Sequence, residues 1–223
     1  MTVLDSLVSI EFVDLADRNP RTSVPLSDEE RHRAARIPDD SLRARFETGR
    51  SELRRILGAL LGIDPATVPI STGPWGKPFV PGAGIEFSYS RSGSVGVVAT
   101  ARNARIGVDI EAIDNTVDVA RVARRVLAPD ELDDFEASSD RRRTLLRFWT
   151  LKEALAKGCG TGFSVEPQDI RVTLDPRAIS TPDGSRPDGW WLDHQMVARS
   201  YVLAVAVEMD GDPERGPPSI RHS

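Results

Sequence analysis

The order of periodic segments in this chain repeats, and this order constrains the fold more than any other feature. In each half, a segment typical of a strand comes first, segments of helical periodicity follow, and segments that predict antiparallel strands come last. No repeat of individual residues accompanies this order. We therefore predict an α+β fold of two similar α+β lobes in tandem, related by a pseudo-twofold axis, with the active site in the cleft between them.

The boundaries of the two lobes follow from these segments. We place an N-terminal lobe at residues 1–104, a C-terminal lobe at residues 105–210 and a flexible, Pro-rich tail at residues 211–223. The elements expected in the first lobe are a strand at Val8–Val13, helices after Ser27 and after Asp39 or Asp40, and a hairpin of Ile85–Tyr89 and Val95–Ala99 joined across residues 90–94. The elements expected in the second are a strand at Ile106–Ile110, helices at 117–127, from Pro129 and from Ser139 or Asp140 to Lys157, and strands near 170–174, 190–192 and 200–208.

Composition and charge narrow the class of protein. The 223 residues are 39% hydrophobic and 28% charged, a balance typical of soluble globular proteins. The apolar runs are far shorter than the ~20 residues that a membrane helix needs. The net charge of −5 argues against general nucleic-acid binding. With no signal peptide visible and one cysteine, Cys159, we expect a cytoplasmic protein in a reducing environment.

Basic residues are unevenly distributed along the chain. Between Arg31 and Arg55 there are eight arginines against four acidic residues. This local excess suggests a compact anionic ligand, although for this stretch taken alone a solvated helix face is the better explanation. The chain contains only three lysines, Lys77, Lys152 and Lys157. Because lysine releases a proton far more readily than arginine, these positions are candidates for chemistry that arginine would perform badly.

The segment Ile106-Gly107-Val108-Asp109-Ile110-Glu111 alternates as a strand does. Residues two apart share a face, so Asp109 and Glu111 should point the same way while Val108 and Ile110 face the core. Two carboxylates on one face repel each other unless a cation lies between them, and hard oxygen ligands of this kind suit Mg²⁺. The alternative is a strand that ends in solvent-exposed acids.

The segment Trp149-Thr150-Leu151-Lys152-Glu153-Ala154-Leu155-Ala156-Lys157 has helical character. Glu153 and Lys157 are four residues apart and share a helix face, which is also the spacing of an ordinary stabilising ion pair. Upstream, Trp75-Gly76-Lys77-Pro78 forms a stiff loop, and Ser90-Arg91-Ser92-Gly93 forms a predicted turn. Both can donate hydrogen bonds to phosphate oxygens, and both are also ordinary turns.

Taken together, these segments resemble the 4'-phosphopantetheinyl transferases of the surfactin-synthetase-activating (Sfp) type. The family signature is a Gly-hydrophobic-Asp-hydrophobic-Glu strand followed by Trp-x-x-Lys-Glu-Ala-x-x-Lys on a helix. These motifs stand here as Gly107–Glu111 and Trp149–Lys157, and the Gly-Lys-Pro loop and Ser-x-Ser-Gly turn precede them in the family's order. The length fits the two-lobed type of the family.

The resemblance implies a Mg²⁺-dependent enzyme that transfers the 4'-phosphopantetheine group of coenzyme A to a serine of an apo carrier protein and releases 3',5'-ADP. It implies Asp109, Glu111 and Glu153 as metal ligands. Glu153 would accept the proton of the carrier serine, directly or through a water, and Lys157 would neutralise the pyrophosphate and protonate the leaving group. The residues that would bind coenzyme A are Arg45, Lys77, Ser90, Arg91, Lys152 and Lys157, with Arg31 and Arg33 as further candidates for the 3'-phosphate.

One residue departs from the family pattern, because Arg91 stands where the family usually has histidine. Arginine keeps a donor and fixes the positive charge, so binding of the 3'-phosphate should survive with less dependence on pH. The expected partner is an acidic acyl or peptidyl carrier protein, met by Arg121, Arg124 and Arg125. A basic helix end is also ordinary compensation of the helix dipole. The sequence leaves open whether the carrier serves fatty-acid, polyketide or nonribosomal peptide synthesis, and we expect a monomer.

Two other classes of protein share part of this pattern. A Mg²⁺-dependent hydrolase of nucleotide pyrophosphates would use the same carboxylates without a carrier protein. A non-catalytic module that binds coenzyme A or a carrier protein would need the basic residues but not the intact carboxylates.

Overall fold

The computed structural model describes residues 8–16, 24–113, 118–160, 166–174, 177–180, 189–209 and 220–222. The elements of the first half are β1 (Val8–Asp14), α1 (Asp28–Ala35), α2 (Asp40–Leu61), the 3₁₀ helix η1 (Pro65–Thr67), β2 (Ser71–Thr72), β3 (Pro78–Phe79), β4 (Ile85–Ser92) and β5 (Val95–Arg102). The elements of the second half are β6 (Ile106–Ala112), α3 (Val119–Val126), α4 (Pro129–Ala137), α5 (Arg141–Cys159), the 3₁₀ helix η3 (Pro167–Asp169), β7 (Arg171–Leu174), β8 (Arg177–Ser180), β9 (Trp190–Val197), β10 (Tyr201–Glu208) and β11 (Ile220–His222).

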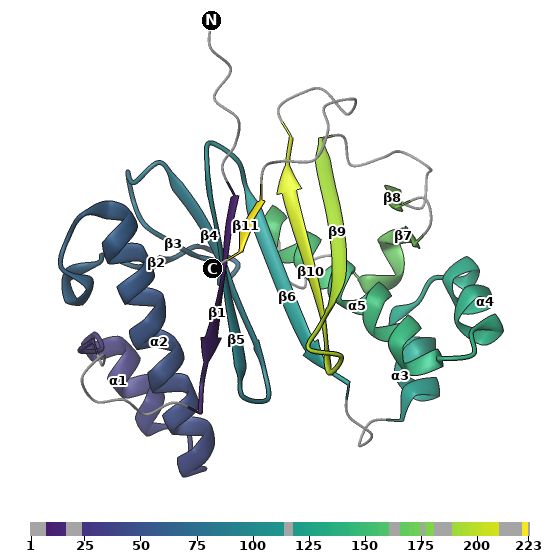
Figure 1. The fold of residues 1–223 in the computed structure, drawn as a ribbon, viewed down its shortest axis with the longest axis horizontal. Coiled ribbons are helices and arrows are strands. Elements are labelled where there is room, and N and C mark those ends of the chain that lie inside the picture. Colours follow the sequence, from purple (N-terminus) through teal and green to yellow (C-terminus); the bar gives the residue numbers. More distant parts are fainter. Residues whose placement is uncertain are drawn as a thin grey trace, which may run out of the picture.

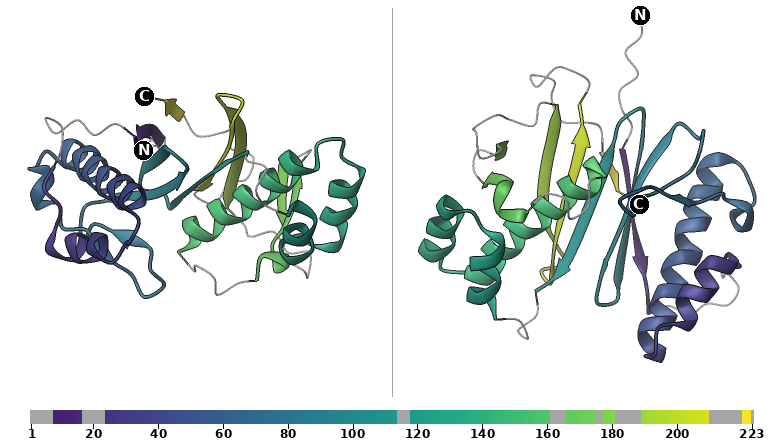
Figure 2. Two further views of the ribbon diagram at one scale, coloured as in Figure 1. Left: turned by 90° about the horizontal axis from the view of Figure 1, so that it is seen from below. Right: turned by 180° about the vertical axis from the view of Figure 1, so that it is seen from behind.

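These elements form four layers, helix, sheet, sheet and helix (Figures 1 and 2). The first sheet has the order β11-β1-β5-β4 and the second the order β6-β10-β9. Helices α1 and α2 cover the outer face of the first sheet, and α5 covers the outer face of the second, with α3 and α4 packed outside α5. The predicted α+β class is confirmed. We call each large sheet with the helices that cover it a lobe, and β11, from the far end of the chain, belongs to the sheet of the first lobe. The predicted domain boundaries stay predictions. The pseudo-twofold relation between the lobes stays a prediction.

Helix ends lie where the sequence places caps. Ser27 begins α1 with a capping box, in which its hydroxyl accepts from the Glu30 amide and the Glu30 carboxylate accepts from the Ser27 amide. Asp39 caps α2 and Asp140 caps α5, the helix that carries the second motif. Gly160 ends α5 in the left-handed conformation, φ 71°, so the helix includes every residue from Trp149 to Lys157.

The hairpin of β4 and β5 is longer than predicted. Residues 90–92, which we expected in a loop, lie in β4, and only Gly93 and Ser94 form the turn, with Gly93 at φ 59°. A two-residue turn needs a positive φ, which glycine supplies at little cost. The longer strand matters for the site, because strand alternation then decides which way Ser90, Arg91 and Ser92 point.

The two sheets pack face to face through a continuous apolar core. Val108 and Ile110 of β6 lie in this core, as the alternation of the motif predicts. Their burial leaves Gly107, Asp109 and Glu111 on the opposite face of β6, toward α5. The buried members of this core are Val8, Ile10, Val97, Ala99, Ala101, Ala104, Ile106, Val108, Ile110, Leu203, Val205 and Val207.

The C-terminal end of the chain departs from the prediction of a flexible tail. Residues 220–222 form β11, which pairs in parallel with Val8–Ile10 of β1 and extends the first sheet. A parallel partner satisfies backbone groups at the edge of β1, which explains why these residues are ordered. The rest of the predicted tail lies outside the described residues. Among the helices that the structure describes, none is long and apolar enough to cross a membrane.

Candidate functional site

The site is built on the close contact between β6 and α5. A Cβ placed on Gly107 would overlap the carbonyl oxygen of Ala154 and the amide nitrogen of Gly158, so only glycine allows the strand to lie against the helix at this distance. This contact holds the strand face with Asp109 and Glu111 against the helix face with Glu153 and Lys157. The two sequence motifs therefore meet in space.

Ser90, Asp109 and Lys157 form a triangle of hydrogen bonds. The Ser90 hydroxyl donates to Asp109 Oδ1 at 2.7 Å, and Lys157 Nζ donates to the same oxygen at 2.6 Å and to Ser90 Oγ at 3.0 Å. Asp109 is only 3% exposed, whereas the Lys157 side chain is about one third exposed. The three groups come from β4, β6 and α5, so the triangle joins both lobes.

Three serines of β4 form a ladder of hydrogen bonds to β6. Ser88 Oγ accepts from the Val108 amide at 3.1 Å, one step before Ser90 reaches Asp109. Ser92 Oγ donates to Glu111 Oε2 at 2.9 Å and accepts from the Ala112 amide at 3.0 Å. The ladder sets the register between β4, an edge strand of the first sheet, and β6, an edge strand of the second. It orients both carboxylates of the strand motif.

The three acidic side chains perturb one another. Burial raises the pKa of Asp109, although Lys157 and Ser90 oppose the shift. Burial also raises the pKa of Glu111, and the Asp109 carboxylate adds to that rise. The pKa of Glu153 is raised by burial, then by Asp109 and Glu111. The Asp109 carboxylate thus acts on both glutamates, so the three acidic side chains lie in one electrostatic environment.

We call the region where β4 and α5 meet β6 the seam. The oxygen donors there fit a hard divalent cation. Asp109 Oδ2 is buried and has no hydrogen-bond partner in the part of the chain that the structure describes, so one carboxylate oxygen is available to a ligand. The ammonium of Lys157 already neutralises Asp109 Oδ1. Among the described residues, no three side chains of His, Cys, Asp or Glu converge as a preformed metal cage. A cation would therefore have to draw Glu111 and Glu153 toward Asp109.

Lys152 does not lie in this site, which corrects the expectation that it contacts coenzyme A. Its side chain is 1% exposed, and Nζ donates to Glu131 Oε2 at 2.5 Å and to the carbonyl oxygens of Val126 and Pro167, each at 2.9 Å. All three protons of the ammonium are used, and no path to solvent remains for a phosphate. The physical reason is helical geometry, because Lys152 lies on the face of α5 that packs against α3 and α4.

Lys77 lies at the seam but is engaged with the protein. Its Nζ donates to the carbonyl oxygens of Gly158 at 3.0 Å and Ile106 at 3.3 Å and forms an ion pair with Glu86 at 3.3 Å. Burial lowers the pKa of Lys77, and Glu86 opposes the shift. The residue thus bridges the two lobes, and a contact with coenzyme A would require it to exchange these partners.

Arg91 points away from the carboxylates. In β4 it alternates with Ser90, so it shares the face of Tyr89 and is exposed. Arg45 of α2 reaches the turn that follows β4, since it donates to the carbonyl oxygen of Gly93 at 3.3 Å. Arg33 and Arg50 lie over the ring of Phe46, each 5.6 Å from its centroid.

Arg31 is held by local partners at the start of α1. It donates to the carbonyl oxygen of Leu26 and to the Asp28 carboxylate. It shares no contact with the Asp109 triangle.

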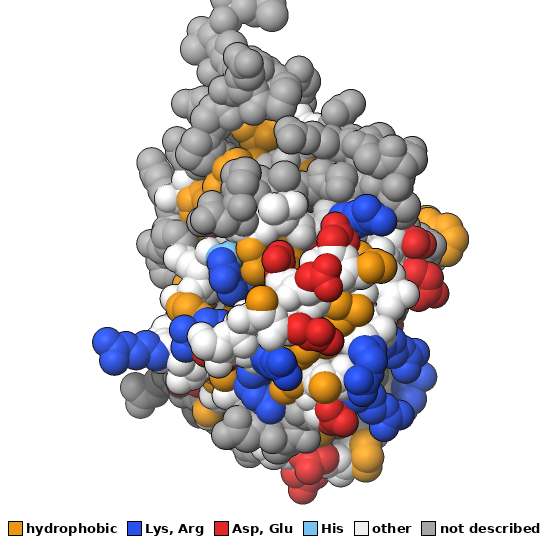
Figure 3. Space-filling view, turned by 90° about the vertical axis from the view of Figure 1, so that its right-hand side faces the viewer, with side chains coloured by type: hydrophobic (Ala, Val, Ile, Leu, Met, Phe, Trp, Pro, Cys, Tyr) orange, Lys and Arg blue, Asp and Glu red, His pale blue; other side chains and the backbone are white. Residues whose placement is uncertain are grey.

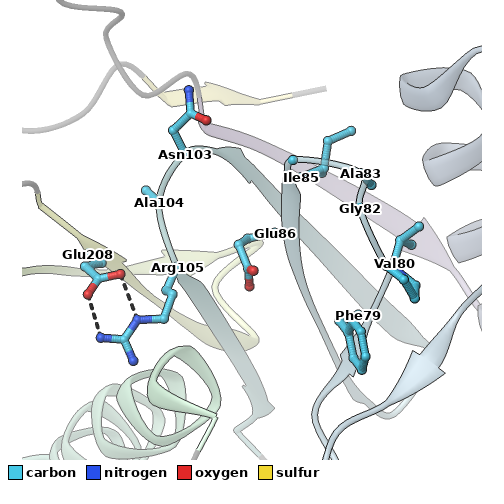
Figure 4. A pocket seen from close by; sticks show the side chains of 12 residues that line it. Phe79, Val80, Gly82, Ala83, Ile85, Glu86, Asn103, Ala104, Arg105 and Glu208 are labelled. Carbon is cyan, nitrogen blue, oxygen red and sulfur yellow. Dashed lines mark hydrogen bonds and ion pairs between the residues drawn. The ribbon is translucent and has the colours of Figure 1, made fainter.

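A hollow of about 450 Å³ lies between the lobes at the opposite end of the seam from Ser90. Figure 4 shows Glu86 facing the gap between the Phe79–Ile85 segment and the Arg105–Glu208 ion pair. None of Asp109, Glu111, Glu153 and Lys157 lines it. This hollow therefore lies at the Glu86 end of β4, apart from the predicted site residues, and the predicted active-site cleft between the lobes stays a prediction.

Sequence reasoning missed Ser88, and it missed the contacts that Ser92 and Trp149 make with Glu111. Ser92 and Ser88 orient β6, and Trp149 donates a hydrogen bond that stabilises the charged form of Glu111. The alternation of serines at positions 88, 90 and 92 was the available signal, but it indicates a ladder only if residues 90–92 are assigned to a strand. Trp149 opens the helix motif, and its side chain is partly buried against the core of the second lobe.

Carboxylates from a strand and a helix, joined by a lysine and a serine hydroxyl, are typical of enzymes that act on phosphate esters with a divalent cation. Residues 105–206 match the model of the 4'-phosphopantetheinyl transferase superfamily. The transferase HetI of Nostoc sp. is 32% identical over 190 residues, which cover 82% of this chain and 78% of that protein. The chain therefore belongs to the 4'-phosphopantetheinyl transferase superfamily.

Further relatives carry the same description. A 4'-phosphopantetheinyl transferase of Bacillus subtilis is 28% identical, over 77% of this chain and 78% of that protein. The transferase Sfp of Bacillus subtilis strain 168 is 25% identical, over 89% of each chain. The resemblance to the Sfp type is thus confirmed at the level of the family.

Proposed function

We propose that this chain transfers the 4'-phosphopantetheine group of coenzyme A to a serine of an apo acyl or peptidyl carrier protein and releases 3',5'-ADP. One observation carries the proposal: Asp109 meets Ser90 and Lys157 at the seam between the lobes, beside two further acidic side chains. We place the reaction at this seam because the residues of the strand motif and the helix motif meet there.

The reaction transfers one phosphoryl group from the bridging oxygen of coenzyme A to the serine oxygen of the carrier. The serine hydroxyl of the carrier attacks the β-phosphorus of coenzyme A, a bond forms between that phosphorus and the serine oxygen, and the bond to the bridging oxygen breaks. Glu153 accepts the serine proton, directly or through a water. Lys157, one helical turn on, leaves Asp109, neutralises the pyrophosphate and supplies a proton to the leaving group.

Mg²⁺ is the cation that suits these oxygen donors. We propose that Asp109 binds it through Oδ2, the buried oxygen without a partner in the described chain, with Glu111 and Glu153 as the other ligands. When bound, the ion would withdraw negative charge from the pyrophosphate. Ser92 and Trp149 hold Glu111 in the direction of the site.

Coenzyme A would bind along β4. Ser90 faces the carboxylates, while Arg91 and Arg45 flank the other side of the same strand end, so a ligand that crosses this edge meets a hydroxyl and two guanidinium groups. Lys77 remains a candidate contact, provided that it releases its bonds to Gly158 and Ile106. Arg33 and Arg31 remain weaker candidates for the 3'-phosphate, because Phe46 and Asp28 engage them.

The carrier protein would dock on α3. Arg121, Arg124 and Arg125 are exposed on this helix, and none forms an ion pair within the described part of the chain. Figure 3 faces this side of the molecule and shows basic side chains in groups beside acidic ones. An acidic carrier would therefore meet free arginines on α3, next to the helix that carries Glu153 and Lys157.

One assay tests the function. The enzyme is incubated with coenzyme A, Mg²⁺ and an apo carrier protein, and the carrier is weighed by mass spectrometry. The proposal predicts a mass gain of one phosphopantetheine. Release of 3',5'-ADP without carrier modification would instead indicate a pyrophosphate hydrolase, and no reaction with any apo carrier would leave only a binding module.

Variants test the site. Asp109→Asn and Glu153→Gln should fold but lose activity by about a hundredfold or more, since each removes a charge that the proposed metal and proton transfer need. Asp134→Asn, an exposed acid of α4, is the matched control and should retain activity. Mg²⁺ should raise the melting temperature of the wild type and the control, and should fail to raise that of Asp109→Asn.

We also propose that the protein acts as a monomer in the reducing interior of the cell, because two lobes of one chain already form the seam. Gel filtration with light scattering tests the oligomeric state. A stable dimer would contradict the proposal.

A further inference from the structure

Lys152 and Glu131 form an ion pair inside the second lobe. The two side chains are 1% and 2% exposed, and Lys152 Nζ lies 2.5 Å from Glu131 Oε2. Glu131 also accepts from two backbone amides, that of Ala128 through Oε2 and that of Val172 through Oε1, each at 2.7 Å. Every polar atom of both side chains is therefore satisfied, which is the condition for a charged pair to persist in an apolar core.

This pair joins α5 to every element packed on its outer side. Lys152 binds the carbonyl oxygens of Val126, the last residue of α3, and of Pro167, the first residue of η3. Glu131 in the first turn of α4 holds the bend before α4 and the start of β7. Three segments that are distant in sequence, α3, α4 and η3, thus converge on one side chain of α5, and Glu131 adds β7.

The position of Lys152 on α5 gives the pair a connection to the reaction. Lys152 directly precedes Glu153, and successive residues on a helix point about 100° apart. Fixing the Lys152 side chain on the α3 and α4 side therefore fixes the rotation of α5 about its axis. That rotation decides whether Glu153 and Lys157 point at Asp109, and the same bonds hold α3, the proposed docking helix, against α5.

We propose that Lys152 and Glu131 are a positioning pair, which sets the rotation of α5 and ties α3 to it, and that neither residue touches coenzyme A. This inference rests on the proposed function. It assigns a role to Glu131, which lies outside the two sequence motifs, and it separates Lys152 from Glu153 and Lys157 although all three belong to one motif. The lysine holds the helix, and the glutamate and the later lysine face the substrate.

The electrostatics of the pair allow a sharp test. Removing one partner leaves an uncompensated buried charge, which destabilises a protein strongly, whereas removing both charges together is often tolerated. Lys152→Met and Glu131→Gln should therefore each lower the melting temperature, and the double variant should recover much of it. A contact with substrate would give a different pattern, because only Lys152 could make it.

The experiment measures kcat and KM for coenzyme A and for the carrier in the wild type, the two single variants and the double variant. We expect both single variants to lower kcat by about tenfold to a hundredfold, since a shift of about 1 Å in a reacting group has this effect, with KM for coenzyme A changed less than about twofold. The double variant should regain stability but keep a lowered kcat. Arg105→Met, which breaks an exposed ion pair with Glu208, is the control and should leave kcat unchanged.

A structural readout accompanies the kinetics. Amide hydrogen exchange at Ala128 and Val172 should accelerate in Glu131→Gln and in the double variant, because both amides lose their carboxylate acceptor. If the single variants do not fold at 25 °C, the double variant alone decides the matter.

Distinct results would overturn the inference. If Lys152→Met raised KM for coenzyme A while Glu131→Gln kept the kinetics of the wild type, Lys152 would be a substrate contact. A double variant with the kcat of the wild type would make the pair a source of stability only. A wild type that modifies no carrier would instead refute the proposed function, so the two failures are distinguishable.

Discussion

The backbone of Gly107 lies directly against the backbone of Ala154, with no room between them for a side chain. This contact between β6 and α5 explains why the strand motif begins with glycine. Any Cβ at this position would overlap the carbonyl oxygen of Ala154, which belongs to a helix backbone and cannot rotate away. The distance between the strand carboxylates and Glu153 therefore depends on glycine, which has no side chain, at position 107.

Gly107→Ala should separate β6 from α5 and abolish most of the activity. We expect a loss of stability of about 2–3 kcal/mol from overpacking, and a fall in kcat of about a hundredfold because Asp109 and Glu153 move apart. Gly58→Ala on α2 is the matched control. Its Cβ would lie 2.9 Å from Pro65 of η1, far from the carboxylates. Both variants should have a lower melting temperature than the wild type, but only Gly107→Ala should have a lower kcat. Equal kcat values in the two variants would show that this contact does not set the site geometry.

Ser92 offers a test of the serine ladder. Ser92→Ala removes a donor from Glu111 and an acceptor from the Ala112 amide, so we expect Mg²⁺ to bind about tenfold more weakly while KM for coenzyme A changes little. Ser92→Thr keeps the hydroxyl and should restore binding. Ser94→Ala is the control, because the Ser94 hydroxyl forms no hydrogen bond within the described part of the chain. Mg²⁺ titration followed by thermal melting without coenzyme A measures the effect, and unchanged Mg²⁺ binding in Ser92→Ala would remove the ladder from the site.

Local patterns in the sequence were sufficient to predict the helices and the face of β6. Ser27, Asp39 and Asp140 cap helices as their residue types indicate, and Val108 and Ile110 are buried as alternation requires. These features depend on neighbours within one or two turns. The same reasoning correctly placed Asp109 and Glu111 on one face, because a strand allows no other arrangement.

Features that depend on distant residues could not be predicted in this way. The burial of Lys152 depends on Glu131 and on the carbonyl oxygens of Val126 and Pro167, which the sequence does not bring together. The parallel pairing of β11 with β1 joins the two ends of the chain, and no local pattern distinguishes residues 220–222 from a free tail. The extension of β4 through Ser92 comes from its pairing with β5, where Arg91 lies opposite Gly96 and Ser92 opposite Val95, and this pairing overrides the turn propensity of serine and glycine.

The raised pKa values of the three carboxyl groups predict how stability depends on pH. Burial raises the pKa of Asp109, Glu111 and Glu153 above the unfolded value, so the folded protein binds these protons more tightly. The resulting stabilisation is fully present below the unfolded pKa, about 4, and is lost as pH rises through the folded pKa. Without metal, the melting temperature should therefore carry a component that falls with rising pH.

Mg²⁺ should reverse this loss, because it binds the carboxylates only in their charged form. Melting temperatures measured from about pH 5 to about pH 8, with EDTA and with Mg²⁺, should diverge as pH rises. Asp109→Asn and Glu153→Gln should reduce the divergence, whereas Asp134→Asn should preserve it. An increase in melting temperature with Mg²⁺ that is equal at every pH would contradict the assignment of these residues as ligands.

Arg91 takes the place of a histidine that the family usually has, and its position predicts the consequence. The side chain is exposed on the face of β4 opposite Ser90, so it is placed to contact an anion but not the reacting groups. Arg91→Ala should raise KM for coenzyme A by about tenfold and leave kcat nearly unchanged, as expected for one charge-assisted hydrogen bond. Arg91→His should bind coenzyme A almost as well as the wild type below about pH 6 and lose affinity above about pH 7, since imidazole loses its charge in that range. Arg102→His, at an exposed arginine outside the site, controls for the general effect of the substitution. A fall in kcat of the same size for Arg91→Ala would instead place Arg91 in the chemical step. That result would contradict this assignment, because the side chain points away from the reacting groups.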